Sequence, residues 1–365
     1  MADYSNRIKD LEEELANTKY NKKTQHHIGL LKAKIAKLKE KESSRGGGKG
    51  GGEGYSVKKS GDSTVILLGF PSVGKSTLLN ALTNANSEVA EYAFTTLDVI
   101  PGLMEYNHAK IQVLDVPGIV EGAASGKGRG REVLAVLRSA DLVLLLVDVN
   151  QPQQFNALLK EVYDSGLRLN KKKPDVVLNK TSKGGLSIGS TVKLTKINKA
   201  TMEAILKEYR IMNAEVVVRT DITPDEFIDV IEGNKKYVRS LTVVTKKDMI
   251  SPEEVEKVAT SVNSDLQISA QSGEGIEKLK QKIYNSLGLM RVYCKEVNKE
   301  ADLDEPMIMT ENSTIKDMCV KLHKDFLMNF KYARVWGDSA KFQGQVFKKP
   351  GHMLRDGDIV ELHIK

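Results

Sequence analysis

A glycine-rich stretch at residues 69–79, GFPSVGKSTLL, has the residue types and spacing of a phosphate-binding loop. Gly69, Gly74, Lys75 and Ser76 fit the pattern G-x-x-x-x-G-K-[ST]. In such a loop, backbone N–H groups surround phosphate oxygens, the lysine reaches the outer phosphates and the hydroxyl binds magnesium. The nucleotide-contacting residues predicted from this stretch are Gly69, Phe70, Pro71, Ser72, Val73, Gly74, Lys75, Ser76 and Thr77.

The segments on both sides of the loop support this prediction. Residues 64–69 form a short apolar run typical of a buried strand, and residues 76–82 place Leu78, Leu79 and Leu82 at helical spacing. The start of that helix would add its unpaired N–H groups and its dipole to an anion site. A glycine turn that matches the pattern by chance is the alternative, and the flanking segments disfavour it.

Two further stretches could bind magnesium and sense the γ-phosphate. Asp115 ends a predicted strand at 110–115, and its carboxylate can reach magnesium through water, while the N–H of Gly118 can meet the γ-phosphate. Loss of that phosphate would release the loop, which is the basis of a switch. Thr96 precedes this strand and can bind the same metal. The predicted metal ligands are Ser76, Thr96 and Asp115. The predicted catalytic residues are Lys75, Thr96 and Gly118. In the loop that ends the strand, the residues predicted to contact the nucleotide are Asp115, Val116, Pro117 and Gly118.

Residues 241–248, LTVVTKKD, predict which base is bound. Lys246 can lie along the base, and Asp248 can accept hydrogen bonds from two guanine N–H groups, a donor pair that adenine does not offer. The small-residue stretch at 268–271 can direct a backbone N–H at the guanine oxygen. The predicted base-contacting residues are Thr245, Lys246, Lys247, Asp248, Ser269, Ala270 and Gln271.

The composition limits the class of protein. The chain has 365 residues, of which 40% are hydrophobic and 28% charged, and this predicts two or three soluble globular domains. No apolar run reaches the roughly 18 residues of a membrane helix, and the polar N-terminus does not resemble a secretory signal. Cys294 and Cys319 lack metal-binding spacing and are expected to be packing residues. We therefore expect a cytoplasmic protein with no membrane partner.

The net charge of +7 is concentrated near the N-terminus. Residues 1–60 hold 14 Lys or Arg and 8 Asp or Glu, a local charge of +6. Residues 3–42 have helical spacing, as one long helix or two short ones, within a basic arm at 1–45, and a glycine-rich linker follows at 46–62. We therefore expect a basic arm that moves relative to the rest of the chain. It suggests RNA as a partner, and a solvated helix face is the alternative.

Strands and helices alternate between residues 63 and 290, the pattern of a mostly parallel sheet with helices on both faces. Within this region, residues 165–238 are too long for a simple crossover connection between two strands, so we predict that they form an inserted α/β subdomain. Asn179 and Lys180 in this insertion resemble half of an Asn-Lys-x-Asp motif, but no Asp follows, so we reject them as base-binding residues. Residues 291–365 predict a small mixed α+β domain that ends in an alternating strand.

Several stretches resemble the developmentally regulated GTP-binding proteins, a branch of the Obg-related GTPases, over essentially the full chain. The matching stretches are GFPSVGKSTLL, EYAFTTLDVIPG, DVPGIVEGAASGKGRGR, TPDEFIDVIEGN, FKYARVWGDSAK and NKKTQHHIGLLKAKIAKLK. The resemblance implies a P-loop GTPase domain with a helical N-terminal arm, an inserted ribosomal-protein-like α/β subdomain and a C-terminal TGS domain of β-grasp type. It also implies GTP and GDP as ligands, Mg²⁺ as cofactor, association with ribosomes or ribosomal RNA, and a stabilising protein as a candidate partner.

Two departures from common GTPase patterns affect the expected chemistry. Thr245 replaces the usual Asn of Asn-Lys-x-Asp, and its hydroxyl reaches less far than an amide, so we expect lower nucleotide affinity with guanine selection kept by Asp248. Ile119 stands where many GTPases have a water-orienting Gln, so we expect slow hydrolysis aided by a monovalent cation such as K⁺, a partner or ribosomal RNA. A nucleotide-regulated RNA- or ribosome-binding module with incidental hydrolysis is the main alternative. An ATPase is a more distant one, which Asp248 disfavours.

Overall fold

The computed structural model describes residues 4–19, 21, 24–44, 61–83, 100–116 and 136–364. The chain divides into two compact units. The first unit comprises residues 1–55, 121–138 and 159–238, and the second comprises residues 56–120, 139–158 and 239–365. The predicted site residues Thr96, Pro117 and Gly118, the predicted departure at Ile119 and the glycine-rich part of the linker lie outside the described residues.

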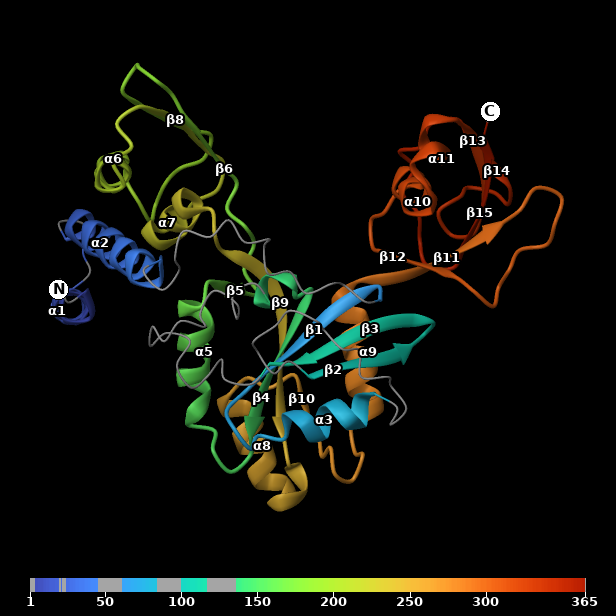
Figure 1. The fold of residues 1–365 in the computed structure, drawn as a ribbon, viewed down its shortest axis with the longest axis horizontal. Helices are drawn as coiled ribbons and strands as arrows, with labels where there is room; N and C mark the ends of the chain where they lie inside the picture. Colours follow the sequence, from blue (N-terminus) through green and yellow to red (C-terminus); the bar gives the residue numbers. More distant parts are fainter. Residues whose placement is uncertain are drawn as a thin grey trace. The chain divides into compact units, whose positions relative to one another are not determined.

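The largest sheet has the strand order β10-β9-β4-β1-β3-β2, and β5 pairs with the beginning of β9 (Figure 1). Neighbouring strands along this order are parallel except for the antiparallel β2–β3 pair. The strands are β1 (Ser63–Leu68), β2 (Ile100–Tyr106), β3 (Ala109–Asp115), β4 (Leu142–Asp148), β5 (Leu167–Leu169), β9 (Lys236–Thr245) and β10 (Leu266–Gln267). The predicted mostly parallel sheet is confirmed.

Apolar strands bury both faces of this sheet. All residues of β1 are buried, and so are all residues of β4 except the last. On one face, α3 (Lys75–Leu82) and α9 (Ile276–Leu287) contribute to a common apolar core. On the other face, α8 (Pro252–Ser261) and the beginning of α5 (Gln154–Asp164) pack against β4 and β9. This two-sided covering explains why the central strands are continuous apolar runs rather than alternating ones.

Strand β9 begins at Lys236, before the apolar run at 241–245. Residues 236–238 pair in parallel with β5, which lies near the start of the predicted insertion. Both ends of the segment 165–238 therefore belong to the parallel sheet, and the separate sheet of the insertion begins only at Val176. Apolar spacing over 241–245 indicated the strand but not its extension, because residues 236–237 are only half-buried.

A three-stranded sheet of order β6-β8-β7 forms a second core within the first unit. Its elements are β6 (Val176–Lys180), β7 (Leu186–Ser190), β8 (Ala214–Val218), α6 (Lys199–Glu208) and α7 (Pro224–Glu232). One face of the sheet packs on both helices around Phe227, which is fully buried. Thr223 and Glu226 form a capping box that fixes the start of α7. The rejected residues Asn179 and Lys180 lie in β6 of this sheet.

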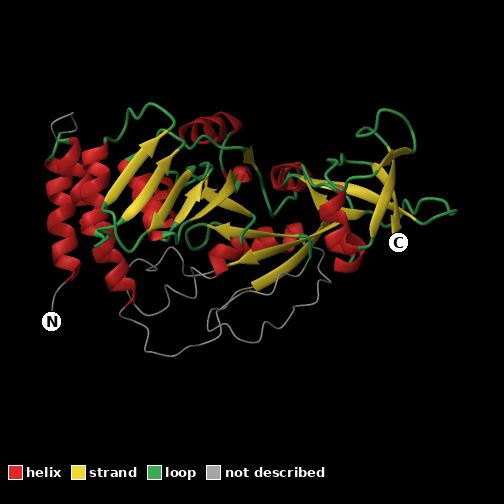
Figure 2. Cartoon of the chain, turned by 90° about the horizontal axis from the view of Figure 1, so that it is seen from above, coloured by secondary structure: helices red, strands yellow, loops and turns green. Residues whose placement is uncertain are grey.

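The N-terminal residues form two helices, α1 (Tyr4–Asn17) and α2 (Gln25–Ser44), which lie side by side (Figure 2). The expectation of a mobile arm is wrong for α2, which packs on α6 and α7 of the same unit. Ala33 belongs to the core of the inserted sheet, and the Gln25 side-chain amide donates to the Lys196 carbonyl at 2.6 Å. Charge and helical spacing alone could not reveal this contact, because the partner residues lie more than 150 positions away.

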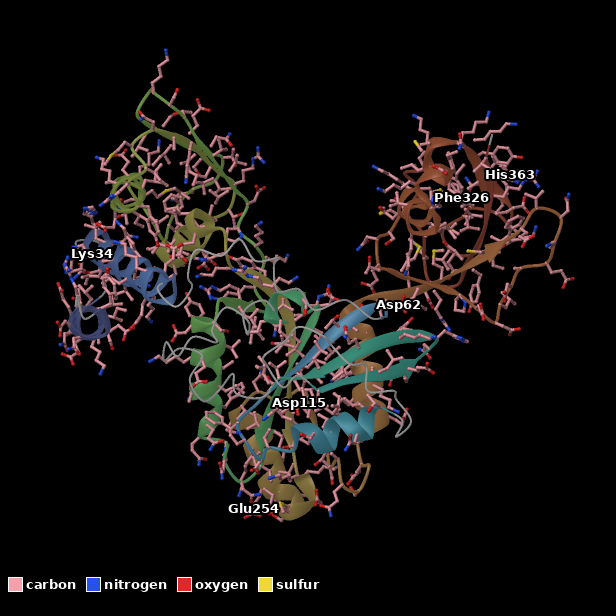
Figure 3. The ribbon with its side chains drawn as sticks, viewed as in Figure 1. Lys34, Asp62, Asp115, Glu254, Phe326 and His363 are labelled. Atoms are coloured by element: carbon pink, nitrogen blue, oxygen red, sulfur yellow. The ribbon has the colours of Figure 1, made fainter. Side chains whose placement is uncertain are left out.

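The C-terminal segment forms a five-stranded mixed sheet of order β12-β11-β15-β13-β14. Its elements are β11 (Leu289–Lys295), β12 (Met307–Thr310), α10 (Ile315–Leu322), α11 (Lys324–Met328), β13 (Phe330–Trp336), β14 (Gln345–Phe347) and β15 (Asp358–Ile364). Figure 3 labels Phe326 on α11 and His363 on β15. Cys319 is buried in this core and Cys294 packs against it, so both cysteines are packing residues as predicted. None of the helices in the described residues is long and apolar enough to cross a membrane.

The packing of α2 can be tested at Gly29, where a Cβ atom would lie 2.5 Å from Thr201 Cγ2 of α6. Gly29→Val should force the helices apart and destabilise the chain by roughly 1–3 kcal/mol, despite the gain in helix propensity. Thermal melting would show a lower midpoint than for Lys34→Val, which introduces the same side chain at an exposed position of α2 (Figure 3). Equal melting of the two variants would mean that α2 does not pack on α6.

Candidate nucleotide site

The loop between β1 and α3 has the backbone of an anion cradle. A Cβ atom on Gly69 would lie 2.8 Å from the Val73 side chain and 2.9 Å from the Leu146 carbonyl, so only glycine fits there. Gly74 has a φ of 97°, a left-handed conformation that favours glycine, and it is the N-cap of α3. No side chain caps this helix start. The first N–H groups of α3 are therefore directed at the loop, as an anion site requires.

The Lys75 ammonium is held inside this loop. Its Nζ donates to the carbonyl oxygens of Gly69 and Phe70, each at 3.0 Å. These contacts place a positive charge over the loop at the beginning of α3, where it adds to the helix dipole. This is the position at which a lysine can reach the outer phosphates of a nucleotide.

Ser76 of α3 and Asp115 of β3, which Figure 3 labels, are brought together from two elements. The Ser76 hydroxyl donates to Asp115 Oδ2 at 3.0 Å, and Asp115 is only 3% exposed. Asp115 Oδ1 is buried and has no hydrogen-bond partner among the described residues. A hydroxyl beside a carboxylate with an unsatisfied oxygen fits the oxygen ligands that Mg²⁺ prefers.

A metal at this position would also need ligands from outside the described residues. In the part of the chain that the structure describes, no group of three or more His, Cys, Asp or Glu side chains could hold a metal ion. Mg²⁺ commonly binds through one or two protein groups together with substrate phosphates. The pair of Ser76 and Asp115 therefore fits a magnesium site that is completed by a bound nucleotide.

Thr245 connects the phosphate loop to the predicted base-binding loop. Its hydroxyl lies 2.8 Å from the carbonyl oxygen of Val73 and 3.2 Å from that of Val147, and the residue is 2% exposed. A hydroxyl has one proton, so it can donate to one of these oxygens at a time. Thr245, which replaces the usual Asn, can therefore still hydrogen-bond to the backbone of the phosphate loop or of β4.

Lys246 follows Thr245 in a left-handed conformation, with a φ of 59°. Its Nζ lies 2.7 Å from Asp148 Oδ2 at the end of β4. Burial disfavours the ionised Asp148 carboxylate, but hydrogen bonds from Lys246 and Asn150 outweigh it and hold the pKa of this carboxyl below its usual value. Asp148 thereby fixes the direction of the Lys246 side chain.

Asp248 and Ser269 lie on two adjacent loops. Asp248 is exposed in a short 3₁₀ turn, residues Lys247–Met249. The backbone N–H of Lys247 donates to the Ile268 carbonyl at 3.2 Å, which ties this turn to the loop that follows β10. Ser269 is fully buried, and its backbone N–H donates to the Glu274 carbonyl, which leaves Ala270 and Gln271 at the bend of that loop.

The chain matches three family models. The model described as "50S ribosome-binding GTPase" matches residues 64–180, the "C-terminal region of MMR_HSR1 domain" matches 183–289 and the "TGS domain" matches 290–364.

The relatives extend over nearly the whole chain. An uncharacterized GTP-binding protein of Methanocaldococcus jannaschii is 54% identical over 98% of this chain and 92% of its own. Developmentally-regulated G-protein 3 of Arabidopsis thaliana is 46% identical over 99% of each chain. Developmentally-regulated GTP-binding protein 2 of Homo sapiens is 43% identical over 98% of each chain. The chain belongs to the developmentally regulated GTP-binding protein family.

Family membership confirms the resemblance inferred from the sequence motifs, together with a P-loop GTPase domain and a C-terminal TGS domain. In this member of the family the structure connects the phosphate loop to Asp115 and to Thr245 through direct hydrogen bonds. Asp148 is the residue that sequence reasoning missed at this site. An acidic residue at the carboxyl end of a central strand was its only signal, and its partner became visible only when β4 and β9 paired.

The role of Asp148 can be tested with Asp148→Asn, which keeps the size of the side chain but removes its charge. Lys246 is predicted to lie along a bound base. Without its charged partner it should hold the base less well, so the affinities for GTP and GDP should fall by similar factors, roughly threefold to tenfold for a partly exposed ion pair. The two affinities should fall together because the base is common to both nucleotides. Titration with fluorescent GTP and GDP analogues measures both. A lower affinity for GTP alone would place the effect at the γ-phosphate instead.

Proposed function

We propose that the chain binds GTP with Mg²⁺, hydrolyses it to GDP and phosphate, and uses this cycle to switch its association with the ribosome. The observation that supports this most directly is the contact between Ser76 and Asp115 at the start of α3, beside an unsatisfied carboxylate oxygen. The description of the matching family as a ribosome-binding GTPase supports the partner.

The phosphate side of the mechanism follows from charge and position. Lys75 and the N–H groups of α3 would bind the outer phosphates, and Ser76 and Asp115 would hold Mg²⁺, with Thr96 as the ligand predicted from sequence. The metal would neutralise phosphate charge. Gly118, also predicted from sequence, would donate its N–H to the γ-phosphate, so that the loop after Asp115 senses whether that phosphate is present.

The base side selects guanine. Asp248 is exposed and would accept two hydrogen bonds from guanine, while Lys246, oriented by Asp148, would lie along the ring. Adenine would leave the Asp248 carboxylate without these donors in a site otherwise shaped for them. The hydrogen bond between Thr245 and Val73 would transmit the position of the base to the phosphate loop.

The expected rate of hydrolysis distinguishes two functions. Ile119 has an aliphatic side chain that cannot orient a water molecule, which supports slow intrinsic hydrolysis. A ribosome-activated GTPase should show multiple-turnover phosphate release that rises at least tenfold when ribosomes are added. A nucleotide-regulated binding module should bind ribosomes differently with GTP and GDP, without such a rise. Phosphate release measured with and without ribosomes separates them.

Guanine selection can be tested with Asp248→Asn. The amide has one acceptor oxygen and one donor NH₂, so it can pair with the N–H and the 2-oxo group of xanthine but cannot accept from both guanine N–H groups at once. The variant should therefore lose GTP affinity and gain affinity for xanthosine triphosphate. A loss on the order of 100-fold for GTP would match the removal of a charged double acceptor.

The matched control is Glu253→Gln, which makes the same chemical change at an exposed position of α8. It should leave competition between GTP and xanthosine triphosphate unchanged. Unaltered GTP affinity in Asp248→Asn would show that this residue does not contact the base.

A further inference from the structure

A pronounced local excess of positive charge lies in the inserted subdomain. Residues 166–200 contain nine Lys or Arg and a single acid, Asp175. One of the nine, Arg168, is buried and forms a two-pronged ion pair with Asp229, at 2.6 and 2.7 Å. The others are exposed lysines in β6, in the loops around β6 and β7, and at the start of α6. They are Lys171, Lys172, Lys173, Lys180, Lys183, Lys193, Lys196 and Lys199.

The lysines of α2 are in a different situation. Lys32 pairs with Asp225 at 2.5 Å, Lys37 with Glu208 at 3.1 Å, and Lys39 with Asp164 at 3.4 Å. All three acids belong to the same unit. Three lysines of the arm are therefore neutralised within the chain, and they help to hold α2 on α6, α7 and α5.

Most lysines of the inserted subdomain have no such partner. Among the described residues, Lys172, Lys173, Lys180, Lys183 and Lys193 form no ion pair within 4 Å. In Figure 3, nitrogen-tipped side chains extend outward from the loops around β6 and β8. Unpaired, exposed cations in one region attract polyanions, because no internal acid screens them.

The strand register places these lysines at both ends of the sheet. Val176 of β6 and Ser190 of β7 both lie opposite Val218, so the segments that carry Lys173 and Lys193 meet at one end. Lys180 and the loop that carries Lys183 lie at the other end, opposite Ala214. The hydrogen bond from the Thr191 N–H to the Val218 carbonyl and that from the Arg219 N–H to the Asp175 carbonyl confirm the first grouping. Strands of this length separate the two groups by about 13 Å.

The sheet face between these two groups is open. The inward residues of β8 pack on α6 and α7, whereas Glu215 and Val217 point outward and are exposed. On the neighbouring strands, Asn179, Ser187 and Gly189 are paired beside them and are also exposed, and Val177 of β6, which is paired with Val217, is half-buried. Apart from the two valines, these side chains are small or polar, and none is aromatic, so the face lacks the large apolar anchors that most protein partners need.

We propose that this face, with lysines at both ends, binds the phosphate backbone of folded RNA without reading its sequence. The inference deepens the proposed ribosome association and rests on it for the identity of the RNA. Phosphate contacts require only accessible cations and close approach, which the small outer residues allow. Double-helical RNA offers such phosphates along a wide, shallow groove. Glu215, in the middle of the face, opposes the approach of phosphates and limits the affinity.

The test uses the full-length chain and a short mixed-sequence RNA duplex as the probe, across a series of salt concentrations. Lys172→Gln, Lys173→Gln and Lys193→Gln combined should weaken binding on the order of tenfold or more at low salt. They should also reduce the slope of log K against log salt by about two, since each lost phosphate contact removes roughly 0.7–0.9. Glu215→Gln should strengthen binding, because it removes the one negative charge on the face.

The matched control combines Lys257→Gln, Lys278→Gln and Lys316→Gln, which removes the same charge from exposed positions on α8, α9 and α10. Its salt slope should stay that of the unmodified chain. Equal slopes for the two triple variants, or no binding of the duplex by the unmodified chain, would overturn the proposal. Melting temperature and GTP affinity should be the same for all variants, since every changed residue is exposed.

Sedimentation with ribosomes separates this inference from the proposed function. Binding of the duplex without binding of ribosomes would leave the RNA face intact and remove the ribosome as the partner. An effect of the first triple variant on ribosome binding but not on the duplex would overturn the RNA assignment and indicate an acidic protein surface instead.

Discussion

The parallel register of the central strands is the constraint on which the nucleotide site depends. Because β1, β3, β4 and β9 run in the same direction, their carboxyl ends meet at one edge of the sheet. Asp148 lies opposite Thr245, and Asp115 lies opposite Leu67 just before the phosphate loop. The strand register alone thus makes neighbours of residues that are far apart in the sequence. Hydrogen bonds across this edge then fix the side chains.

Thr245 shows how little is needed to connect the two halves of the site. Its hydroxyl is short, but burial between the phosphate loop and β4 brings two carbonyl oxygens within its reach. An unpaired hydroxyl in this position would be costly, so the contact is stabilised as much by burial as by the bond itself. Lys246 and Asp148 form a second link at the same edge. The predicted base-binding loop is therefore held to the sheet by two adjacent residues at its beginning.

The distribution of charge has a different meaning once the fold is known. The arm carries most of the net charge in the sequence, yet Lys32, Lys37 and Lys39 of α2 are paired with acids of the inserted subdomain and of α5. In that subdomain, most basic side chains remain exposed around an open sheet face. The sequence total of +6 over residues 1–60 therefore overstates what the arm can offer to a polyanion.

The sequence by itself determined the elements whose signals are local. Apolar runs predicted β1 and β4, glycine spacing predicted the turn at Gly69 and Gly74, and motif order predicted that Asp115 would face the phosphate loop. These signals survive because strand formation, turn geometry and helix starts depend on neighbouring residues.

Only the tertiary structure decided the rest. The pairing of Asp148 with Lys246, the docking of α2 on α6, and the extension of β9 to meet β5 join residues that sequence spacing does not relate. The tertiary structure also decides which lysines form ion pairs with acidic side chains. An ion pair or a buried contact depends on distance in space, and the chain sets that distance only when its strands have found their register.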